Sequence, residues 1–314
     1  MKALTDRITA AFLLIVLLSQ ACRQAAKGPS SIDTPASGQI HISVDESYKP
    51  VIEEQLSMYQ SGNPAAHIIA EYKPEAACLK DFFKDTGNRM ILITRGLTYP
   101  EENYMKDSLG YLPQWNLLAS DAIAIIVNNN NKDTLFTLDR LAQQLAGKIN
   151  RHQTIVFDGL SATSSFRFVQ DSILKGLSPD TTVVRAAKNS LGVIDYVATH
   201  EQAIGLVGIS WIGNPEDTLQ QRLREMVRIS YVRCDACADS PYVKPVQESI
   251  RSRRYPLVRG LYYIIKENYY GLGSGLVDFM KYERGQLIFR RAYLGPVMDF
   301  DSRNVRINLS LPKK

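Results

Sequence analysis

The segment DAIAIIVN, residues 121–128, decides the fold class, because it is apolar without interruption from Ala122 to Val127. Such a run is typical of a strand that is covered on both faces of a sheet. Other strand patterns alternate along the chain with apolar residues at helical spacing. This alternation predicts an α/β protein with mostly parallel sheets flanked by helices.

Hydrophobic periodicity predicts the remaining elements. Strands are expected at residues 40–44, 67–72, 89–94, 154–157, 182–187 and 203–210. Helices are expected at residues 48–59, 75–86, 138–149, 164–175 and 191–200, and beyond residue 244 at 256–269 and 274–284. This number of strands fits either a single sheet or two lobes.

Length and charge narrow the class of protein. The chain has 314 residues, enough for one large domain or two ordinary ones. Its net charge is +5, and its basic residues form no run and no stripe with interleaved aromatic residues. We therefore expect no nucleic-acid partner.

Residues 1–21 have the organisation of a signal peptide. Lys2 and Arg7 precede the apolar run 8–18, which is too short to span a bilayer comfortably. The following SQAC is similar to a lipoprotein cleavage site, so we expect lipidation of Cys22; an ordinary secretory signal with an unpaired cysteine is the alternative. Residues 22–37 are rich in Ala, Ser, Gly and Pro, which predicts a flexible tether. We expect an exported lipoprotein, periplasmic or at the cell surface, that its lipid holds at a membrane.

The other cysteines are Cys78, Cys234 and Cys237. Export implies an oxidising compartment in which disulfides persist. Cys234 and Cys237 have the CxxC spacing, but the loop-like ADSPYVKP follows them instead of a helix. We therefore favour a small local disulfide over a redox pair or half of a metal site.

Catalytic motifs are missing from the sequence. It contains no GxSxG elbow, HExxH motif or Walker loop, and its four histidines are scattered. We expect no enzyme activity, no metal and no cofactor. If the protein were an enzyme, thiol chemistry at Cys234 and Cys237 would be the best candidate for its reaction.

Two predicted strands are followed by polar side chains at the point where a helix begins. Asp45, Glu46 and Ser47 follow the strand at 40–44. Thr94 ends the strand at 89–94 and Arg95 follows it. A salt bridge to Glu101 or Glu102 is the alternative role for Arg95. Free N–H groups of a first helical turn, hydroxyls and a guanidinium are suitable donors for an oxyanion.

A third junction, FDGLSATSSFRF at residues 157–168, is rich in small residues and hydroxyls. Ser161 and Thr163 offer hydroxyls, Ala162 allows close approach to the backbone, and Gly159 permits a tight turn. Read alone, the stretch would more often be a plain helix cap than a binding loop. Three such junctions in one α/β chain favour an anion site at the carboxyl ends of the strands.

Six segments carry a resemblance to a known family. They are DAIAIIVNNNN with LFTLDRLAQQLAGKI, LSATSSF, TRGLTYPEE, AIGLVGIS, YPLVRGLYYIIKE and FMKYERGQLIFRRAYLGPV. In this order they resemble the periplasmic phosphate-binding (PstS-type) proteins of bacterial ABC importers, within the type II solute-binding superfamily. The similarity covers roughly residues 38–298.

The resemblance implies a type II periplasmic-binding-protein fold, in which two lobes close on a ligand. Lobe 1 would comprise residues 38–127 plus 241–314, and lobe 2 residues 128–240. The implied ligand is inorganic phosphate or a related oxyanion, the implied partner is an ABC permease, and the chain is expected to be a monomer. The implied contacts to the ligand come from Asp45, Glu46, Ser47, Thr94, Arg95, Asp158, Ser161, Ala162 and Thr163.

The sequence also departs from the family pattern. The first loop is VDES where the family is Gly-Ser-rich, Ala162 replaces a glycine, and Phe157 falls at the position of an arginine. A buried Asp158 beside the anion would favour a protonated oxyanion, because an ionised ligand repels a carboxylate. We expect a solute-binding lipoprotein that captures phosphate or a similar oxyanion for an ABC importer. The alternative is a surface sensor or interaction module whose anion site has degenerated.

Overall fold

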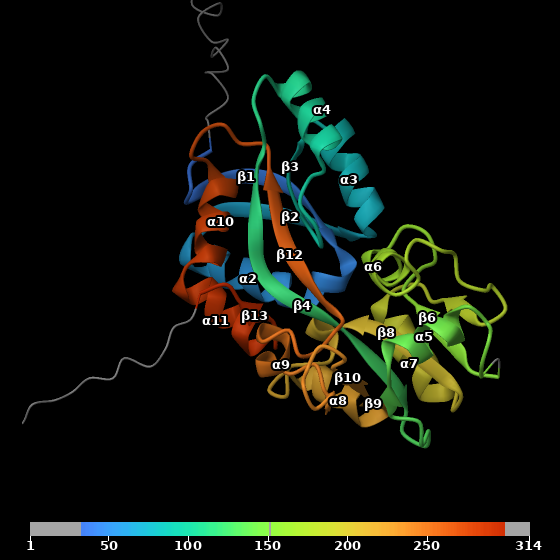
Figure 1. Cartoon of the computed structure of the whole chain (residues 1–314). Helices are drawn as coiled ribbons and strands as arrows, with labels where there is room; N and C mark the ends of the chain where they lie inside the picture. Colours follow the sequence, from blue (N-terminus) through green and yellow to red (C-terminus); the bar gives the residue numbers. More distant parts are fainter. Residues whose placement is uncertain (1–32, 151, 299–314) are drawn as a thin grey trace, which may run out of the picture. The chain divides into compact units, whose positions relative to one another are not determined.

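A computed structural model describes residues 33–150 and 152–298. Strand β4 (Gln114–Asn128) lies in the middle of a sheet that has ten strands within these ranges (Figure 1). It pairs with β12 (Val258–Ile265) through Ala122 and with β8 (Ala203–Gly208) from Ile123 onwards. Thus β4 belongs to two halves of the sheet, which we call the first half and the second half.

The first half contains three parallel strands beside an antiparallel pair. β1 (Ser37–Asp45) lies between β2 (Ala65–Lys73) and β3 (Asn88–Ile93) and is parallel to both. β12 separates β3 from β4 and runs antiparallel to each of them. The parallel strands bring their carboxyl ends to the same edge of the sheet.

The second half repeats this pattern. β6 (Thr154–Phe157) lies between β7 (Val184–Ala186) and β8, parallel to both. β4 is the antiparallel strand of this half, and it also pairs with β9 (Val227–Ile229). Each half therefore has a core of three parallel strands, in agreement with the expected α/β class.

Short strands complete the sheets. β13 (Gly295–Pro296) pairs with β4. β5 (Leu135–Phe136), β10 (Tyr231–Arg233) and β11 (Tyr242–Val243) form a separate three-stranded sheet. The loop between β10 and β11 contains a disulfide between Cys234 and Cys237. The thiol of Cys78 is free and buried.

Helices cover the sheet on both faces. Their bounds are α2 (Lys49–Gly62), α3 (Glu75–Lys84), α4 (Tyr99–Leu109), α5 (Leu138–Leu145), α6 (Ser164–Ser172), α7 (Ser190–Thr199), α8 (Thr218–Met226), α9 (Gln247–Arg251), α10 (Leu272–Lys281) and α11 (Glu283–Arg291), with short 3₁₀ turns at Glu46–Tyr48 and Ile209–Trp211. Side-chain alternation along β3 explains the arrangement. Ile91 and Ile93 pack in a cluster with α3 and α4, whereas Met90 and Leu92 face the main core, to which α2 and α10 also contribute (Figure 1).

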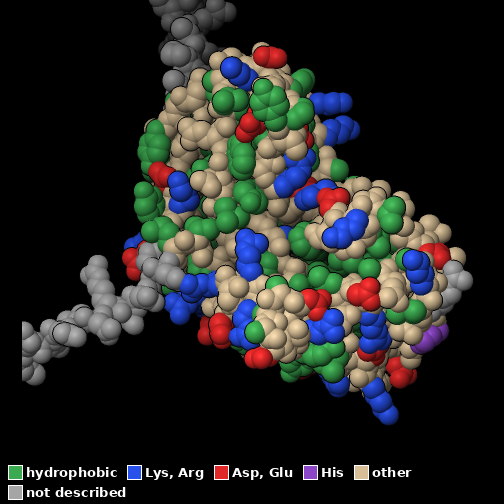
Figure 2. All heavy atoms as spheres, in the orientation of Figure 1, with side chains coloured by type: hydrophobic (Ala, Val, Ile, Leu, Met, Phe, Trp, Pro, Cys, Tyr) green, Lys and Arg blue, Asp and Glu red, His purple; other side chains and the backbone are tan. Residues whose placement is uncertain are grey.

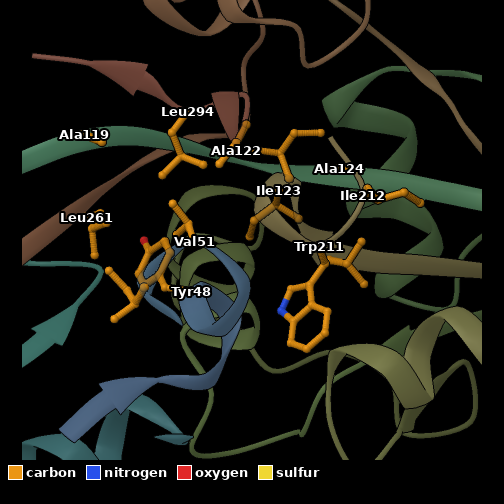
Figure 3. Packing of buried hydrophobic residues seen from close by; sticks show 14 of the residues in the cluster. Tyr48, Val51, Ala119, Ala122, Ile123, Ala124, Trp211, Ile212, Leu261 and Leu294 are labelled. Atoms are coloured by element: carbon orange, nitrogen blue, oxygen red, sulfur yellow. The ribbon is translucent and has the colours of Figure 1, made fainter. Parts of the chain in front are cut away.

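The main core continues from one half of the sheet to the other. Ala122, Ile123 and Ala124 of β4 are completely buried. Figure 3 shows Tyr48, Val51 and Trp211 on the same side of this segment, with Trp211 further along it. The described residues from Thr34 to Met298 accordingly belong to one compact unit by their contacts.

The expected helix at 256–269 is wrong. Residues Val258–Ile265 form β12, which pairs with β3 and β4. Its side chains alternate between partly exposed and buried positions from Val258 to Leu261, which is the period of a strand. Successive aromatic and branched residues, YYII, carry no helical stripe and favour a strand, so the competing pattern was present in the sequence.

Several expectations fall outside the described residues. These are the signal peptide, lipidation of Cys22 and most of the tether. In the part of the chain that is described, no helix has the length and apolarity needed to cross a membrane. Figure 2 shows acidic and basic side chains interspersed over the face in view.

Candidate functional site

The guanidinium of Arg259 lies where the two halves of the sheet meet. Arg259 is on β12, directly opposite Asp121 of β4 in the pairing register. Its Nε donates to Asp121 Oδ2 at 2.7 Å, and both side chains are almost completely inaccessible to solvent. The ring of Tyr48 and the carboxylate of Asp121 stabilise this charge, and the ring centroid lies 5.3 Å from Arg259 Cζ. Although burial lowers the pKa of Arg259, these neighbours raise it above its usual value.

The remaining donors of Arg259 reach hydroxyls from both halves. Nη2 donates to Ser47 Oγ at 2.9 Å, in the turn that follows β1. Nη1 donates to Ser164 Oγ at 2.9 Å and to Ser165 Oγ at 3.5 Å, in the first turn of α6. The hydroxyl oxygens of Ser47 and Ser164 lie 3.5 Å apart. One buried cation therefore joins the turn after β1 to the first turn of α6.

Gly208, the last residue of β8, permits this close approach. A Cβ atom at this position would lie 3.2 Å from Arg259 Nη2 and 3.2 Å from the carbonyl oxygen of Ser47. Two residues further on, Ser210 Oγ donates to the same carbonyl oxygen at 2.7 Å. The absence of a side chain at Gly208 thus leaves room for the guanidinium.

Two buried carboxyl groups flank the guanidinium, one from each half. Asp45 Oδ1 accepts from Ser47 N at 3.0 Å, and Asp158 Oδ2 accepts from Ser165 Oγ at 3.2 Å. Among the described residues, the second oxygen of each carboxyl group has no hydrogen-bond partner. Asp121 Oδ1 is likewise without a partner among the described residues. Buried polar atoms of this kind mark positions where a ligand atom would be stabilised.

Burial favours the protonated form of both carboxyl groups. It raises the pKa of Asp45 to about 7, with a further increase from the charge of Glu75 and an opposing effect of Arg259. Burial likewise raises the pKa of Asp158, against hydrogen bonds from Thr163 and Ser165. A protonated carboxyl can donate a hydrogen bond, whereas a carboxylate can only accept one.

Thr94 lies in a second group of contacts beside the first. Its backbone N donates to Glu75 Oε1 at 3.1 Å, and its hydroxyl also donates to this oxygen. Arg167 of α6 donates to Glu75 Oε2 through Nε at 2.6 Å and to Thr94 Oγ1 through Nη2 at 2.6 Å. Although burial acts in the opposite direction, the hydrogen bonds from Arg167 and Thr94 hold the pKa of Glu75 below its usual value.

The other expected site residues are placed as follows. Glu46 accepts from the Ser190 hydroxyl at 2.8 Å, at the first turn of α7. The carbonyl oxygen of Ala162 accepts from Ala76 N at 3.1 Å, and Thr163 is the buried N-cap of α6. Ser161 is exposed.

Arg95 takes part in a different interaction. Its two terminal nitrogens donate to the two oxygens of Glu101, each at 2.7 Å. Glu101 also accepts from Thr98 N and so belongs to the capping box that begins α4. The guanidinium is thus committed to the salt bridge that the sequence offered as the alternative role for Arg95.

Sequence reasoning missed Arg259, Asp121, Glu75 and Arg167. A signal existed for the first two, because each is a charged residue next to an apolar strand run. Such residues are almost never fully buried unless they are paired. The signal for Arg259 was lost when its segment was interpreted as a helix. Glu75 and Arg167 lie on helices at positions where charged residues are ordinary, so only the fold brings them together.

Comparison with known proteins identifies the class. The PBP superfamily domain matches residues 29–283, and the chain belongs to this superfamily. The fold is the two-lobed periplasmic-binding fold. A search of curated proteins found no match.

Solved structures agree on the fold. A Clostridium perfringens protein assigned as a phosphate ABC transporter substrate-binding protein, with bound phosphate, is 21% identical, with a TM-score of 0.68 over 83% of this chain and 100% of that one. An ABC-type phosphate transport receptor from Vibrio cholerae is 17% identical, with a TM-score of 0.58 over 82% and 99%. PstS from Borrelia burgdorferi is 19% identical, with a TM-score of 0.51 over 83% and 99%. The resemblance noted in the sequence is therefore confirmed for the superfamily and the fold.

Replacing Arg259 tests its role at the junction. Arg259→Met should lower the free energy of unfolding by about 3–5 kcal/mol, because it leaves the carboxylate of Asp121 buried without a partner. Urea denaturation of the wild type and variant measures the difference. Arg254→Met is the control, since Arg254 is exposed and lies 3.9 Å from Glu248, and it should change stability by less than about 1 kcal/mol. Equal losses in the two variants would contradict the assigned role.

The pKa of Asp45 has a consequence for stability. Because the folded state holds this proton more tightly than the unfolded state, unfolding releases it between the ordinary pKa of 3.8 and about 7. The contribution of this proton to the free energy of unfolding is fully present below pH 4 and is lost as the pH rises to about 7. Over this range the free energy of unfolding falls by at most about 1.4 kcal/mol per pH unit.

Asp45→Asn should remove this slope. Urea midpoints measured from pH 4.5 to 8 would show it as a difference between the profiles of wild type and variant. Asp171→Asn is the control, because the carboxylate of Asp171 is 59% exposed. Parallel profiles for the wild type and Asp45→Asn would show that Asp45 ionises normally in the folded protein.

Proposed function

We propose that the chain is a solute-binding protein that captures phosphate, or a related oxyanion, in a protonated form between its lobes. The observation that carries this proposal is the pair of unpartnered buried oxygens on Asp45 and Asp158, one from each half, beside the donors of Arg259. A ligand with both acceptor oxygens and a proton would satisfy carboxyl and guanidinium groups together. Fully ionised sulfate offers no proton and would fit less well.

The proposed ligand contacts come from three strand ends. Asp45 ends β1 and Ser47 follows it, Thr94 follows β3, and Asp158 and Thr163 follow β6. Ser164 and Arg259 join them in the structure. Glu46, Arg95, Ser161 and Ala162 also belong to the expected set. Before Glu46 could contact a ligand, its hydrogen bond with Ser190 would have to break, and Arg95 would likewise have to leave Glu101.

The lobe boundaries and the cellular role are part of the same proposal. Lobe 1 would comprise residues 38–127 with 241–314, and lobe 2 residues 128–240; the change of partner along β4 after Ala122 supports a crossing in this region. The exported protein would be a monomer held at a membrane by lipid on Cys22, and it would deliver the anion to an ABC permease. It would act without catalysis, since hydroxyl and guanidinium donors that replace hydration suffice for binding.

A second candidate function keeps the fold. The protein would be a surface sensor or interaction module with a degenerate anion site. The contacts of Glu75 favour it, because a carboxylate of the chain already takes donors from both lobes.

A calorimetric titration distinguishes the two functions. Phosphate should bind, and at about 100 times its dissociation constant it should stabilise the protein by about 2.7 kcal/mol. Arsenate should bind similarly and sulfate more weakly.

Ser164→Ala should weaken phosphate binding at least about tenfold through loss of a charge-assisted hydrogen bond. Ser172→Ala, which changes an exposed residue on the same helix, should leave phosphate binding unchanged. Absence of phosphate binding in ligand-free wild type would support the second candidate.

Membrane attachment has its own test. Expression of Cys22→Ser should move the protein from the membrane fraction to the soluble exported fraction, because the thiol that would carry the lipid is missing. Cys78→Ser is the control for loss of a thiol, since Cys78 is buried in the folded domain. Membrane retention of Cys22→Ser after removal of peripheral proteins would refute anchoring at this residue.

A further inference from the structure

The carboxylate of Glu75 is buried and surrounded by hydrogen-bond donors, as a bound anionic ligand would be. Glu75 is the first residue of α3, and its side chain is only 3% exposed. Oε1 accepts from the backbone and hydroxyl of Thr94 and from Arg167 Nη2 at 3.3 Å. Oε2 accepts from Arg167 Nε at 2.6 Å. A guanidinium fork, a hydroxyl and a backbone N–H therefore surround one carboxylate.

These donors have the chemistry that binds free oxyanions. Guanidinium groups bind carboxylates and phosphates through two parallel hydrogen bonds. A backbone N–H at the end of a parallel strand, such as that of Thr94 after β3, lies where α/β proteins place their ligands. The donors would be equally suitable for phosphate or a small carboxylate, but here the acceptor comes from the chain.

Glu75 also joins the two lobes. Thr94 follows β3 of the first half, whereas Arg167 lies on α6, which follows β6 of the second half. One residue further along α3, Ala76 N donates to the carbonyl oxygen of Ala162 at 3.1 Å, a second contact between the same two regions. A captured solute would favour closure in the same way, because an anion that is bound by residues of both lobes stabilises the closed arrangement.

We propose that Glu75 is an internal counter-anion, whose carboxylate occupies an oxyanion subsite formed by Thr94 and Arg167. An external oxyanion gains this subsite only by displacing Glu75. This inference rests on the proposed function, because it assigns to the same cleft a residue that limits affinity. Phosphate binding would then be weakened by competition within the chain, and the lobes would stay in contact without a solute.

The strength of this competition follows from tethering. A group attached to the chain next to its site acts at an effective concentration in the millimolar range or above. An external anion must exceed that concentration or make contacts elsewhere, such as those at Arg259 and Ser164. Removal of the Glu75 carboxylate should therefore tighten phosphate binding at least about tenfold.

Glu75→Ala is the direct test, with phosphate, formate and acetate as probes. Calorimetry should show phosphate binding at least about tenfold tighter than in the wild type. Formate or acetate at millimolar concentration should raise the melting temperature of Glu75→Ala, because a small carboxylate can replace the missing side chain, and should leave the wild type unchanged. Glu283→Ala, which removes an exposed carboxylate at the start of α11, is the matched control and should behave as the wild type.

Glu75→Gln keeps the inference testable if the alanine variant fails to fold. It preserves the shape and removes the charge, so phosphate binding should tighten in the same direction. Equal phosphate affinity in the wild type and both variants, without any effect of formate or acetate, would overturn the inference and leave the proposed function intact. Weaker phosphate binding in the variants would also overturn the inference and leave the proposed function intact, since Glu75 would then help to bind phosphate.

The remaining outcomes separate the inference from the proposed function. Binding in Glu75→Ala but none in the wild type would support the internal counter-anion and overturn phosphate capture by the native chain. If neither protein binds phosphate and neither carboxylate stabilises the variant, both proposals fail.

Discussion

The buried pair of Arg259 and Asp121 is the interaction on which the junction depends. It joins β12 to β4 at the point where β4 passes from one half of the sheet to the other. Withdrawing two charges from water costs several kcal/mol per ion, and good geometry with further hydrogen bonds is needed to offset this cost. Ser47 and Ser164 supply such hydrogen bonds, so the need to satisfy one buried cation holds the turn after β1 close to the start of α6.

Carboxyl groups outnumber guanidinium groups around this cation, which determines the chemistry of the junction. Asp121 is paired with Arg259, and Glu75 with Arg167. No second cation is in contact with Asp45 or Asp158 in the hydrogen bonds described, and burial favours their neutral forms. Under the proposed function, a junction of this composition would disfavour highly charged anions.

The sequence predicted the parallel part of the fold and the strand ends where polar residues meet. These predictions succeed because they depend on local periodicity and on the rule that parallel strands end at one edge. The strand β12 was missed because its residues pair with segments more than a hundred positions away, and local periodicity does not report such pairing. Arg259, Glu75 and Arg167 depend on the same long-range pairing. Their partners could not be assigned without the fold, whereas Asp45, Ser47 and Asp158 could be located from the ends of local strands.

The continuity of β4 has a mechanical consequence for the protein. Its fifteen residues form a single strand that is hydrogen-bonded to β12 along one part and to β8 along the next. A change in the angle between the lobes must therefore bend or twist a paired strand, because this connection contains no free loop that could rotate. Such a connection would resist a change in that angle, because bending the strand would strain its hydrogen bonds to β12 and β8.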